Sequence, residues 1–344
     1  MKKLFVAVLA VAALASCAQE DVILNNNKAI TFGDAYVQNS TKAIYDNSNY
    51  VKAFQVWGTV TPNGATESVV LYDGAKVEDT SSVSYNKAWE CEVERFWTPN
   101  CNYAFYAVVD AADGAVTAKD ADNNPTGVPT SIAYAADGVT DLLYGATIKD
   151  TKDGSADAGL VAFEMQHLLS KVSFKFTNTD TNTAYDYKVT KVEVLGAYTN
   201  GTYTITHAAG NIDGNYVGSW AGTGKSTTAL SFLDGALILA DATVSGDNIT
   251  ASTAVAPKSF VIIPGTPALD IAITVETLLN DTKIYSKDYT LKVNQSVEGS
   301  VAKTFEKNTH YNFVVALEGG KPIDFTIGSV GEFGTPAGGD VTIQ

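Results

Sequence analysis

The sequence has few basic residues, and arginine is almost absent. Lysine and arginine together total 23 of the 344 residues against 38 aspartates and glutamates, and Arg95 is the single arginine. The formal net charge is −15 at pH 7. A nucleic-acid-binding protein needs a basic face, and anionic lipid surfaces attract basic segments. The charge balance therefore argues against nucleic acid as a partner and against docking on an anionic lipid surface.

Histidine is also scarce, with three residues in the whole chain. His167, His207 and His310 are far apart, and none has a cysteine or carboxylate at ligand spacing. The Gly-x-Ser-x-Gly motif of serine hydrolases is missing. We therefore expect no metal, no cofactor and no enzymatic activity. His167 stands among apolar residues and is expected to be a hydrogen-bonded histidine of the core or of a domain interface.

Long apolar runs are lacking as well, which excludes a membrane-spanning helix of about 20 residues. The longest run, Leu4–Ala15, follows the basic start of the chain and ends in Leu14-Ala15-Ser16-Cys17. This is the pattern of a secretory signal peptide over residues 1–16. The last four residues resemble the lipobox of bacterial lipoproteins. That resemblance implies cleavage between Ser16 and Cys17 and acylation of Cys17, whereas the simpler alternative is an ordinary signal peptide with a chance cysteine.

Loss of the signal peptide removes two lysines and leaves 21 basic against 38 acidic residues, a net charge of −17. Residues 17–28 are polar and are expected to form a flexible spacer behind the lipidated cysteine.

The rest of the chain shows no helical periodicity over three turns, and many short segments alternate between apolar and polar residues. Phe54–Val60 and Val161–Phe176 alternate in this way, and 103–109 is typical of a strand buried on both faces. Short strands separated by turn signals predict an all-β fold. We expect two β-sandwich domains in tandem, over residues 29–158 and 159–344, with the charged stretch Lys149–Gly159 as their linker.

Two cysteines remain once Cys17 is assigned to lipidation. Cys91 and Cys101 are close enough in sequence to face each other on a hairpin, and an exported protein meets an oxidising compartment. The pair could therefore form a structural disulfide. Without a nearby histidine it is a poor zinc site.

Several local patterns imitate functional motifs. Gly222–Thr227 looks like the end of a phosphate-binding loop, but the glycine that should stand five residues before Gly224 is Ser219. Asp120, Asp122 and Asn124 have calcium-loop spacing, but the loop's glycine and glutamate positions hold proline and serine. Both are interpreted as surface loops. The four tryptophans could stack on sugars but are expected mainly in the core or at its rim: Trp57, Trp89, Trp97 and Trp220.

A set of short motifs, spread over nearly the whole chain, resembles the fimbrillins, the lipoprotein precursors of type V pilus subunits. In order, the motifs are Ile30-Thr31-Phe32, Thr41-Lys42-Ala43, Phe54-x-Val56-x-Gly58, Phe163-x-x-x-His167-x-Leu169-Ser170-Lys171-Val172, Phe174-x-Phe176, Phe305-x-Lys307-Asn308-x-x-Tyr311, and Ile323-x-Phe325-x-Ile327 with Val330. Many relatives have a tryptophan after this last valine, where this chain has Glu332-Phe333.

The resemblance implies two transthyretin-like β-sandwiches and export to the cell outer membrane as a surface-exposed, palmitate-bearing lipoprotein. It also implies maturation by a trypsin-like protease, for which the bond between Lys42 and Ala43 is the best site; relatives often have arginine there. Cleavage would remove the first strand, and the C-terminal stretch Ile323–Ile343 of a neighbouring subunit would fill the groove by donor-strand exchange. The implied partners are other fimbrial subunits, with a host or glycan receptor for cell adhesion.

Three alternatives remain open from the sequence. The subunit could keep its anchor or cap the fibre at its tip. The chain could instead be a surface glycan-binding lipoprotein of a nutrient-uptake system, which fits the anchor, the acidic surface and the tryptophans. A β-sandwich hydrolase has only the number of acidic residues in its favour.

Overall fold

The computed structural model describes residues 28–37, 51–80, 89–135, 137–138, 140–151, 157–182, 184–198, 200–208, 211–222, 229–245, 248–256, 258–265, 268–294, 305–317 and 324–332. All regular structure within these ranges is β-strand, which confirms the predicted all-β class. No helix in the described part of the chain is long and apolar enough to cross a membrane.

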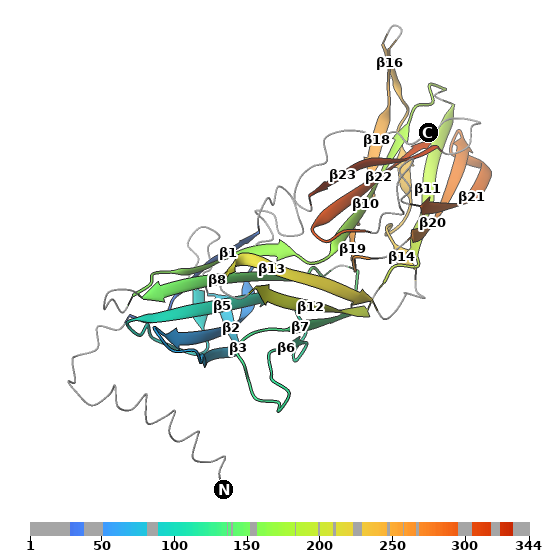
Figure 1. The fold of residues 1–344 in the computed structure, drawn as a ribbon. Helices are drawn as coiled ribbons and strands as arrows, with labels where there is room; N and C mark the ends of the chain where they lie inside the picture. Colours follow the sequence, from blue (N-terminus) through green and yellow to red (C-terminus); the bar gives the residue numbers. More distant parts are fainter. Residues whose placement is uncertain are drawn as a thin grey trace.

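The first group of strands forms a seven-stranded sheet at the lower left of Figure 1. Its spatial order is β1-β9-β8-β5-β2-β3-β4. The strands are β1 (Phe32–Val37), β2 (Ala53–Pro62), β3 (Val69–Asp79), β4 (Trp89–Cys91), β5 (Cys101–Val109), β8 (Leu143–Thr151) and β9 (Val161–His167). Strand β1 is therefore an edge strand, paired in parallel with β9.

A four-stranded sheet packs over one face of this first sheet. Its order is β13-β12-β7-β6, and its strands are β6 (Val116–Thr117), β7 (Ser131–Ala135), β12 (Asn200–Ala208) and β13 (Asn211–Gly222). The two sheets share one apolar core, in which Tyr106 and Tyr144 of the first sheet join Ile132 and Tyr203 of the second. The central strand β5 is thus covered on both faces, which explains its nearly unbroken apolar sequence.

The second group of strands lies at the upper right of Figure 1 and encloses a separate core between two sheets. One sheet has the order β18-β10-β22-β23, with β19 also paired to β10; the other has the order β14-β11-β20-β21, with β15 also paired to β11. The strands are β10 (Ser170–Asn178), β11 (Tyr185–Leu195), β14 (Leu230–Ser231), β15 (Leu237–Leu239), β18 (Ser252–Val255), β19 (Phe260–Ile262), β20 (Ala268–Leu279), β21 (Thr282–Asn294), β22 (Thr309–Leu317) and β23 (Asp324–Glu332). A separate two-stranded hairpin is formed by β16 (Thr243–Ser245) and β17 (Asn248–Thr250).

Alternation along β10 and β22 explains the position of this second core. Val172, Phe174 and Phe176 point to the same face of β10 and are fully buried. Strand β22 runs parallel to β10 and places Phe313 beside Phe174, with ring centroids 5.4 Å apart. The apolar alternation predicted after Lys171 is therefore the inner face of this sheet.

The stretch Lys149–Gly159 does not link two domains. Strand β8 ends at Thr151, β9 begins at Val161, and the two strands are antiparallel neighbours in the first sheet. The chain passes to the second group of strands only at Leu168-Leu169, both fully buried. The β12–β13 hairpin then returns to pair with β7. The domain boundary that the sequence suggested at residue 159 therefore falls between two neighbouring strands of the same sheet.

Candidate functional site

Residues 28–37, called here the closing segment, connect the two edges of the seven-stranded sheet. The first part of the segment pairs with residues 95–97, which follow edge strand β4: the amide of Ile30 donates to the Arg95 carbonyl (2.8 Å), and the amide of Trp97 donates to the Lys28 carbonyl (3.0 Å). The second part is β1, which pairs with β9 at the opposite edge. The segment therefore closes the sheet around the core that lies on its inner face.

Phe32 is the main anchor of the closing segment. Its side chain is 4% exposed and lies at the centre of a cluster of aromatic rings. Its ring centroid is 6.0 Å from Phe54, 5.7 Å from Tyr72, 6.2 Å from Phe105 and 6.4 Å from Phe163. Burying a side chain of this size stabilises a fold by about 1.5–3 kcal/mol, and favourable ring geometry adds to that. Ile30 and Ala35 are buried beside it.

The residue after this anchor is a glycine that allows a close approach to Leu160. A Cβ atom on Gly33 would lie 2.3 Å from Cδ2 and 2.8 Å from Cγ of Leu160. The Leu160 side chain is 53% exposed and covers the strand from the solvent side. A larger residue at position 33 would push Leu160 away from the segment.

Removing the closing segment would uncover polar backbone and apolar surface together. The amide of Val161 donates to the Thr31 carbonyl (2.9 Å) and would lose this partner. Phe163 and Met165, which belong to the same inner core as Phe32, would lose contacts on that side. An unpaired strand edge next to an apolar slot is a template for another strand. The ion pair between Lys28 and Asp157 (2.6 Å) is exposed and adds little.

The C-terminal strand β23 also lies at a sheet edge. It pairs in antiparallel orientation with β22, and Phe325 is opposite Val315. Only Asp324–Glu332 of the predicted donor stretch Ile323–Ile343 falls within the described residues.

The other maturation residues predicted from the sequence lie outside the described part of the chain. These are Ser16 and Cys17 at the signal-peptide cleavage site, and Lys42 and Ala43 at the protease site. Lys28 ends the predicted spacer, but it already belongs to the closing segment through its carbonyl and its ion pair.

Cys91 and Cys101 do not face each other on a hairpin. Cys91 on β4 is opposite Val77, whereas Cys101 on β5 is opposite Pro62 and Thr151. Strands β3 and β2 lie between β4 and β5. Along β2, Cys101 is level with Pro62, whereas Cys91 is level, through Val77, with Phe54. These positions are about 26 Å apart at about 3.3 Å per residue. A disulfide requires Cα atoms within about 7 Å of each other. The two cysteines form no disulfide with each other, and the predicted pairing is wrong because the two strands are not neighbours.

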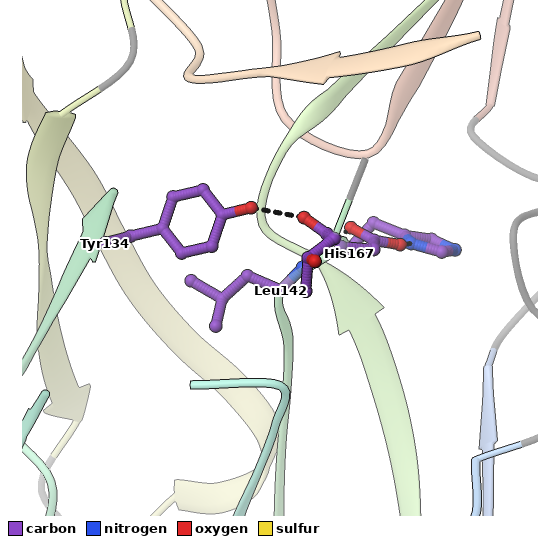
Figure 2. A network of polar contacts seen from close by, with 5 residues as sticks. Tyr134, Leu142 and His167 are labelled. Carbon is purple, nitrogen blue, oxygen red and sulfur yellow. Dashed lines mark hydrogen bonds and ion pairs between the residues drawn. The ribbon is translucent and has the colours of Figure 1, made fainter. Parts of the chain in front are cut away.

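His167 is fully buried at the end of β9, where the chain turns toward β10. Its Nδ1 is hydrogen-bonded to the carboxylate of Asp141, which is 1% exposed and also accepts a hydrogen bond from the Leu142 amide (2.9 Å). Figure 2 shows this pair beside Tyr134, whose hydroxyl donates to the Thr140 carbonyl. The sequence predicted a buried, hydrogen-bonded histidine but missed Asp141, because the two residues meet only through the pairing of β8 with β9.

The other histidines are held by neutral partners. His207 Nε2 lies 3.0 Å from the Pro129 carbonyl oxygen, and burial lowers its pKa. His310 Nε2 lies 2.7 Å from the Ser173 hydroxyl, and burial together with the nearby charge of Lys171 lowers its pKa to about 4. No group of three histidine, cysteine or acidic side chains that could hold a metal ion was found among the described residues.

One of the two imitated motifs has an ordinary structural explanation, and most of the other lies outside the described residues. The Asp120 carboxylate accepts hydrogen bonds from the backbone amides of Asp122 (2.9 Å) and Asn124 (2.8 Å), so it closes a turn in its own loop. Gly222 ends β13, and residues 223–227 of the glycine-rich loop lie outside the described residues.

The tryptophans belong to the apolar cores. Trp57 and Trp97 are buried, and Trp89 packs against the core that holds Phe32. Trp220 is partly buried and donates from Nε1 to the Leu168 carbonyl (2.7 Å). All four therefore pack against the cores, and Trp220 also lines a pocket together with Phe305 and Lys307.

Comparison with known proteins gives one family and a set of solved structures. A family model described as "Fimbrillin-like" matches residues 41–330. A crystal structure of a fimbrial protein from Bacteroides vulgatus is 16% identical, with a TM-score of 0.54, and the match covers 89% of this chain and 100% of that one. A fimbrial assembly protein from Parabacteroides distasonis is 11% identical (TM-score 0.42, covering 89% and 96%). The tip fimbrial protein Mfa3 from Porphyromonas gingivalis is 10% identical (TM-score 0.33, covering 87% and 100%). No curated protein sequence matches the chain.

Proposed function

The chain belongs to the fimbrillin-like family, and we propose that it is a structural subunit of cell-surface fimbriae that polymerises by donor-strand exchange. In this proposal the chain has no catalytic activity. Its partners are other fimbrial subunits, and the assembled fibre takes part in cell adhesion. The observation that carries the proposal is that β1, the strand to be exchanged, is an edge strand anchored by one large side chain.

Export as a lipoprotein is supported by the sequence alone. The Leu-Ala-Ser-Cys end of the signal peptide places Cys17 where acylation requires a cysteine. Acyl chains on Cys17 would hold the precursor in the outer membrane, with residues 18–27 between the anchor and the closing segment. The same anchor therefore attaches to the very segment that exchange must remove.

Cleavage after Lys42 would release that segment in one piece. Strand β1 ends at Val37, so a cut between Lys42 and Ala43 leaves the whole closing segment and Cys17 on the released fragment. A trypsin-like protease cuts after lysine as well as arginine. One proteolytic event would thus free the subunit from its lipid and open the slot along β9.

The proposed donor is the C-terminal stretch Ile323–Ile343 of a neighbouring subunit. Its described part, β23, occupies a sheet edge and is the last strand of the second group. A segment at the end of the chain can leave one subunit and enter another without breaking chain connectivity.

The tryptophans support the glycan-binding alternative less than the sequence suggested. Trp57 and Trp97 are buried, and Trp89 and Trp220 are partly buried against the cores, although Trp220 also lines a pocket. A receptor or glycan on the host remains part of the proposal only as the target of an assembled fibre.

Limited trypsin digestion of the purified full-length chain tests the proposal. Cleavage of the wild type is expected to release residues 17–42 and to produce a ladder of polymers on electrophoresis without boiling. The Lys42→Gln variant should give neither, whereas Lys119→Gln, which removes a different trypsin site, should behave as the wild type. A wild type that is cut at Lys42 without forming polymers, or a Lys42→Gln variant that forms the same ladder, would refute the proposal.

A further inference from the structure

A pocket of about 300 Å³ lies where the two groups of strands meet. It is lined by residues 218–220 of β13, in the first group, and by residues 305–307, which precede β22 in the second group. Pro264 and Gly265, which follow β19, complete the lining. Pockets for small molecules measure about 300–1,000 Å³, so this one has room for a single small ring and not for an extended chain.

Lys307 is held at this pocket by a fully buried tyrosine. Its Nζ donates to the Tyr203 hydroxyl (3.1 Å) and lies 5.6 Å from the centroid of the same ring. A Cβ on Gly218 would lie 2.2 Å from the Tyr203 hydroxyl oxygen, so the glycine leaves the space that this rigid ring occupies. Burial lowers the pKa of Lys307, because its ammonium group has lost part of its hydration.

The backbone that carries Lys307 is fixed by hydrogen bonds on both sides. The Phe305 carbonyl accepts from the Gly265 amide (2.9 Å). The Glu306 amide donates to the Tyr311 hydroxyl (2.9 Å), and the Glu306 carbonyl accepts from the Ser170 hydroxyl (2.6 Å). This part of the pocket is therefore preorganised, which reduces the ordering that a ligand would have to impose.

Trp220 gives the pocket an aromatic surface. Its Nε1 donates to the Leu168 carbonyl (2.7 Å), and its ring centroid is 5.3 Å from Tyr203 and 6.2 Å from Tyr134. These contacts fix the orientation of the indole, which is only partly buried. Because the indole N–H is already used, Trp220 offers mainly apolar surface to a ligand.

Two residues of opposite charge, Glu306 and Lys307, line the same pocket. A ligand with a net charge would be attracted by one of them and repelled by the other. A neutral ligand with hydroxyl groups can instead accept a hydrogen bond from the ammonium group and donate one to the carboxylate. A neutral pyranose combines these properties, since it is a single ring with apolar C–H faces and hydroxyl groups around its edge.

We propose that the pocket binds one neutral sugar residue of a glycan, with an apolar face of the ring toward Trp220 and hydroxyl groups toward Glu306 and Lys307. None of the lining residues belongs to the closing segment or to β23, so the site does not depend on strand exchange. In a fibre, many weak copies of the site would act together, and avidity can exceed the affinity of one site by about 100- to 10,000-fold. Only this last consequence rests on the proposed function.

Titration of the purified, unpolymerised full-length chain with methyl glycosides tests the proposal. The neutral probes are the methyl glycosides of glucose, galactose, mannose, fucose and N-acetylglucosamine, and the charged probe is methyl glucuronide. At least one neutral glycoside should change the tryptophan fluorescence with a dissociation constant of about 1–10 mM, as expected for a ligand of about twelve non-hydrogen atoms. The glucuronide should bind more weakly.

The same titration can overturn the proposal. It fails if no neutral glycoside binds up to about 50 mM, either by fluorescence or by saturation-transfer NMR, or if the glucuronide binds more tightly than every neutral probe. Because the chain is unpolymerised, these results are independent of whether trypsin produces a ladder of polymers. The sugar site and strand exchange can therefore fail separately.

Two tryptophan variants locate the binding site. Trp220→Phe should remove the fluorescence change, whereas NMR should still detect binding because an aromatic ring remains. Trp89→Phe is the matched control, since Trp89 is also partly buried but packs against the core around Phe32. It should keep the fluorescence change. Loss of the change in Trp89→Phe and not in Trp220→Phe would place the sugar elsewhere and contradict the proposal.

Charge variants test the two polar contacts. Lys307→Met keeps most of the side-chain length and should weaken binding of the neutral glycoside about 10- to 100-fold, the range expected for loss of a hydrogen bond from a charged group. Glu306→Gln changes an exposed residue and should strengthen binding of the glucuronide relative to the neutral glycoside. Lys283→Met, on the exposed part of β21, should change neither affinity. Unchanged affinities in both Lys307→Met and Glu306→Gln would refute the assignment of the site.

Discussion

Replacing Phe32 by alanine should loosen the closing segment while leaving the second group of strands intact. The side chain is 4% exposed and contacts aromatic rings from β2, β3, β5 and β9. Phenylalanine-to-alanine changes in well-packed cores cost about 3–5 kcal/mol. The closing segment is held to the sheet by non-covalent contacts. Much of the lost free energy should therefore appear as local opening of this segment and not as global unfolding.

Native-state hydrogen exchange can measure that opening at single amides. The amides of Val161 and Trp97 donate to the closing segment, so they report on its detachment. A loss of 3–5 kcal/mol in the opening free energy should accelerate their exchange about 100- to 5,000-fold, at 1.36 kcal/mol per factor of ten. The amide of Phe232, which donates to the Val192 carbonyl in the second group of strands, should be much less affected.

Phe313→Ala serves as the matched control. Phe313 is fully buried in the core of the second group, against Phe174. This variant should lose a similar amount of stability to Phe32→Ala. The amides whose exchange accelerates, however, should lie around β10 and β22. Equal acceleration of all amides in Phe32→Ala, or unchanged exchange at Val161 and Trp97, would refute the view that Phe32 anchors a separately removable strand.

Three further predictions follow from the described contacts and the sequence. Asp141→Asn keeps an acceptor for the Leu142 amide but replaces the carboxyl group that is hydrogen-bonded to His167 Nδ1, and it should lower the free energy of unfolding by about 1–3 kcal/mol in denaturant titrations. Burial lowers the pKa of His310 to about 4, below its value of 6.5 in an unfolded chain, so the unfolded state binds more protons between these values and stability should fall as the pH drops from about 6.5 to 4; the variant His310→Gln should flatten this part of a plot of Tm against pH. Cys17→Ser should abolish acylation, which would be seen as loss of the lipid mass and of the protein from the membrane fraction.

The features that the sequence predicted well depend on local alternation. The alternation of Val172, Phe174 and Phe176 predicts one buried face of a strand. The apolar run at 103–109 predicts a strand covered on both sides. These patterns arise from the side chains of a single strand, whose period of two is independent of its partner. The all-β class follows from them without knowledge of the pairing.

The features that could not be predicted from the sequence depend on which strands become neighbours in a sheet. The pairing of Ile30 with Arg95 joins residues 65 positions apart, and no local pattern signals it. Cys91 and Cys101 are close in sequence, but their strands are separated by β2 and β3. The charged stretch 149–159 has the composition of a linker, but the strands on either side of it, β8 and β9, are neighbours in one sheet.

The closing segment links these observations to the proposed assembly. It carries the large anchor that a folded precursor needs, and it ends five residues before the predicted cleavage site at Lys42. Under the proposed exchange, a donor strand would have to fill the space that the Phe32 side chain leaves in the aromatic cluster. Precursor stability and polymer stability would then depend on the same aromatic cluster.

Mass spectrometry of subunits taken from fibres isolated at the cell surface tests the central claim most directly. The account predicts that each polymerised subunit begins at Ala43, carries no acyl group and lacks the peptide that contains Phe32. Fibre subunits that retain residues 28–37 as part of the same polypeptide would contradict it.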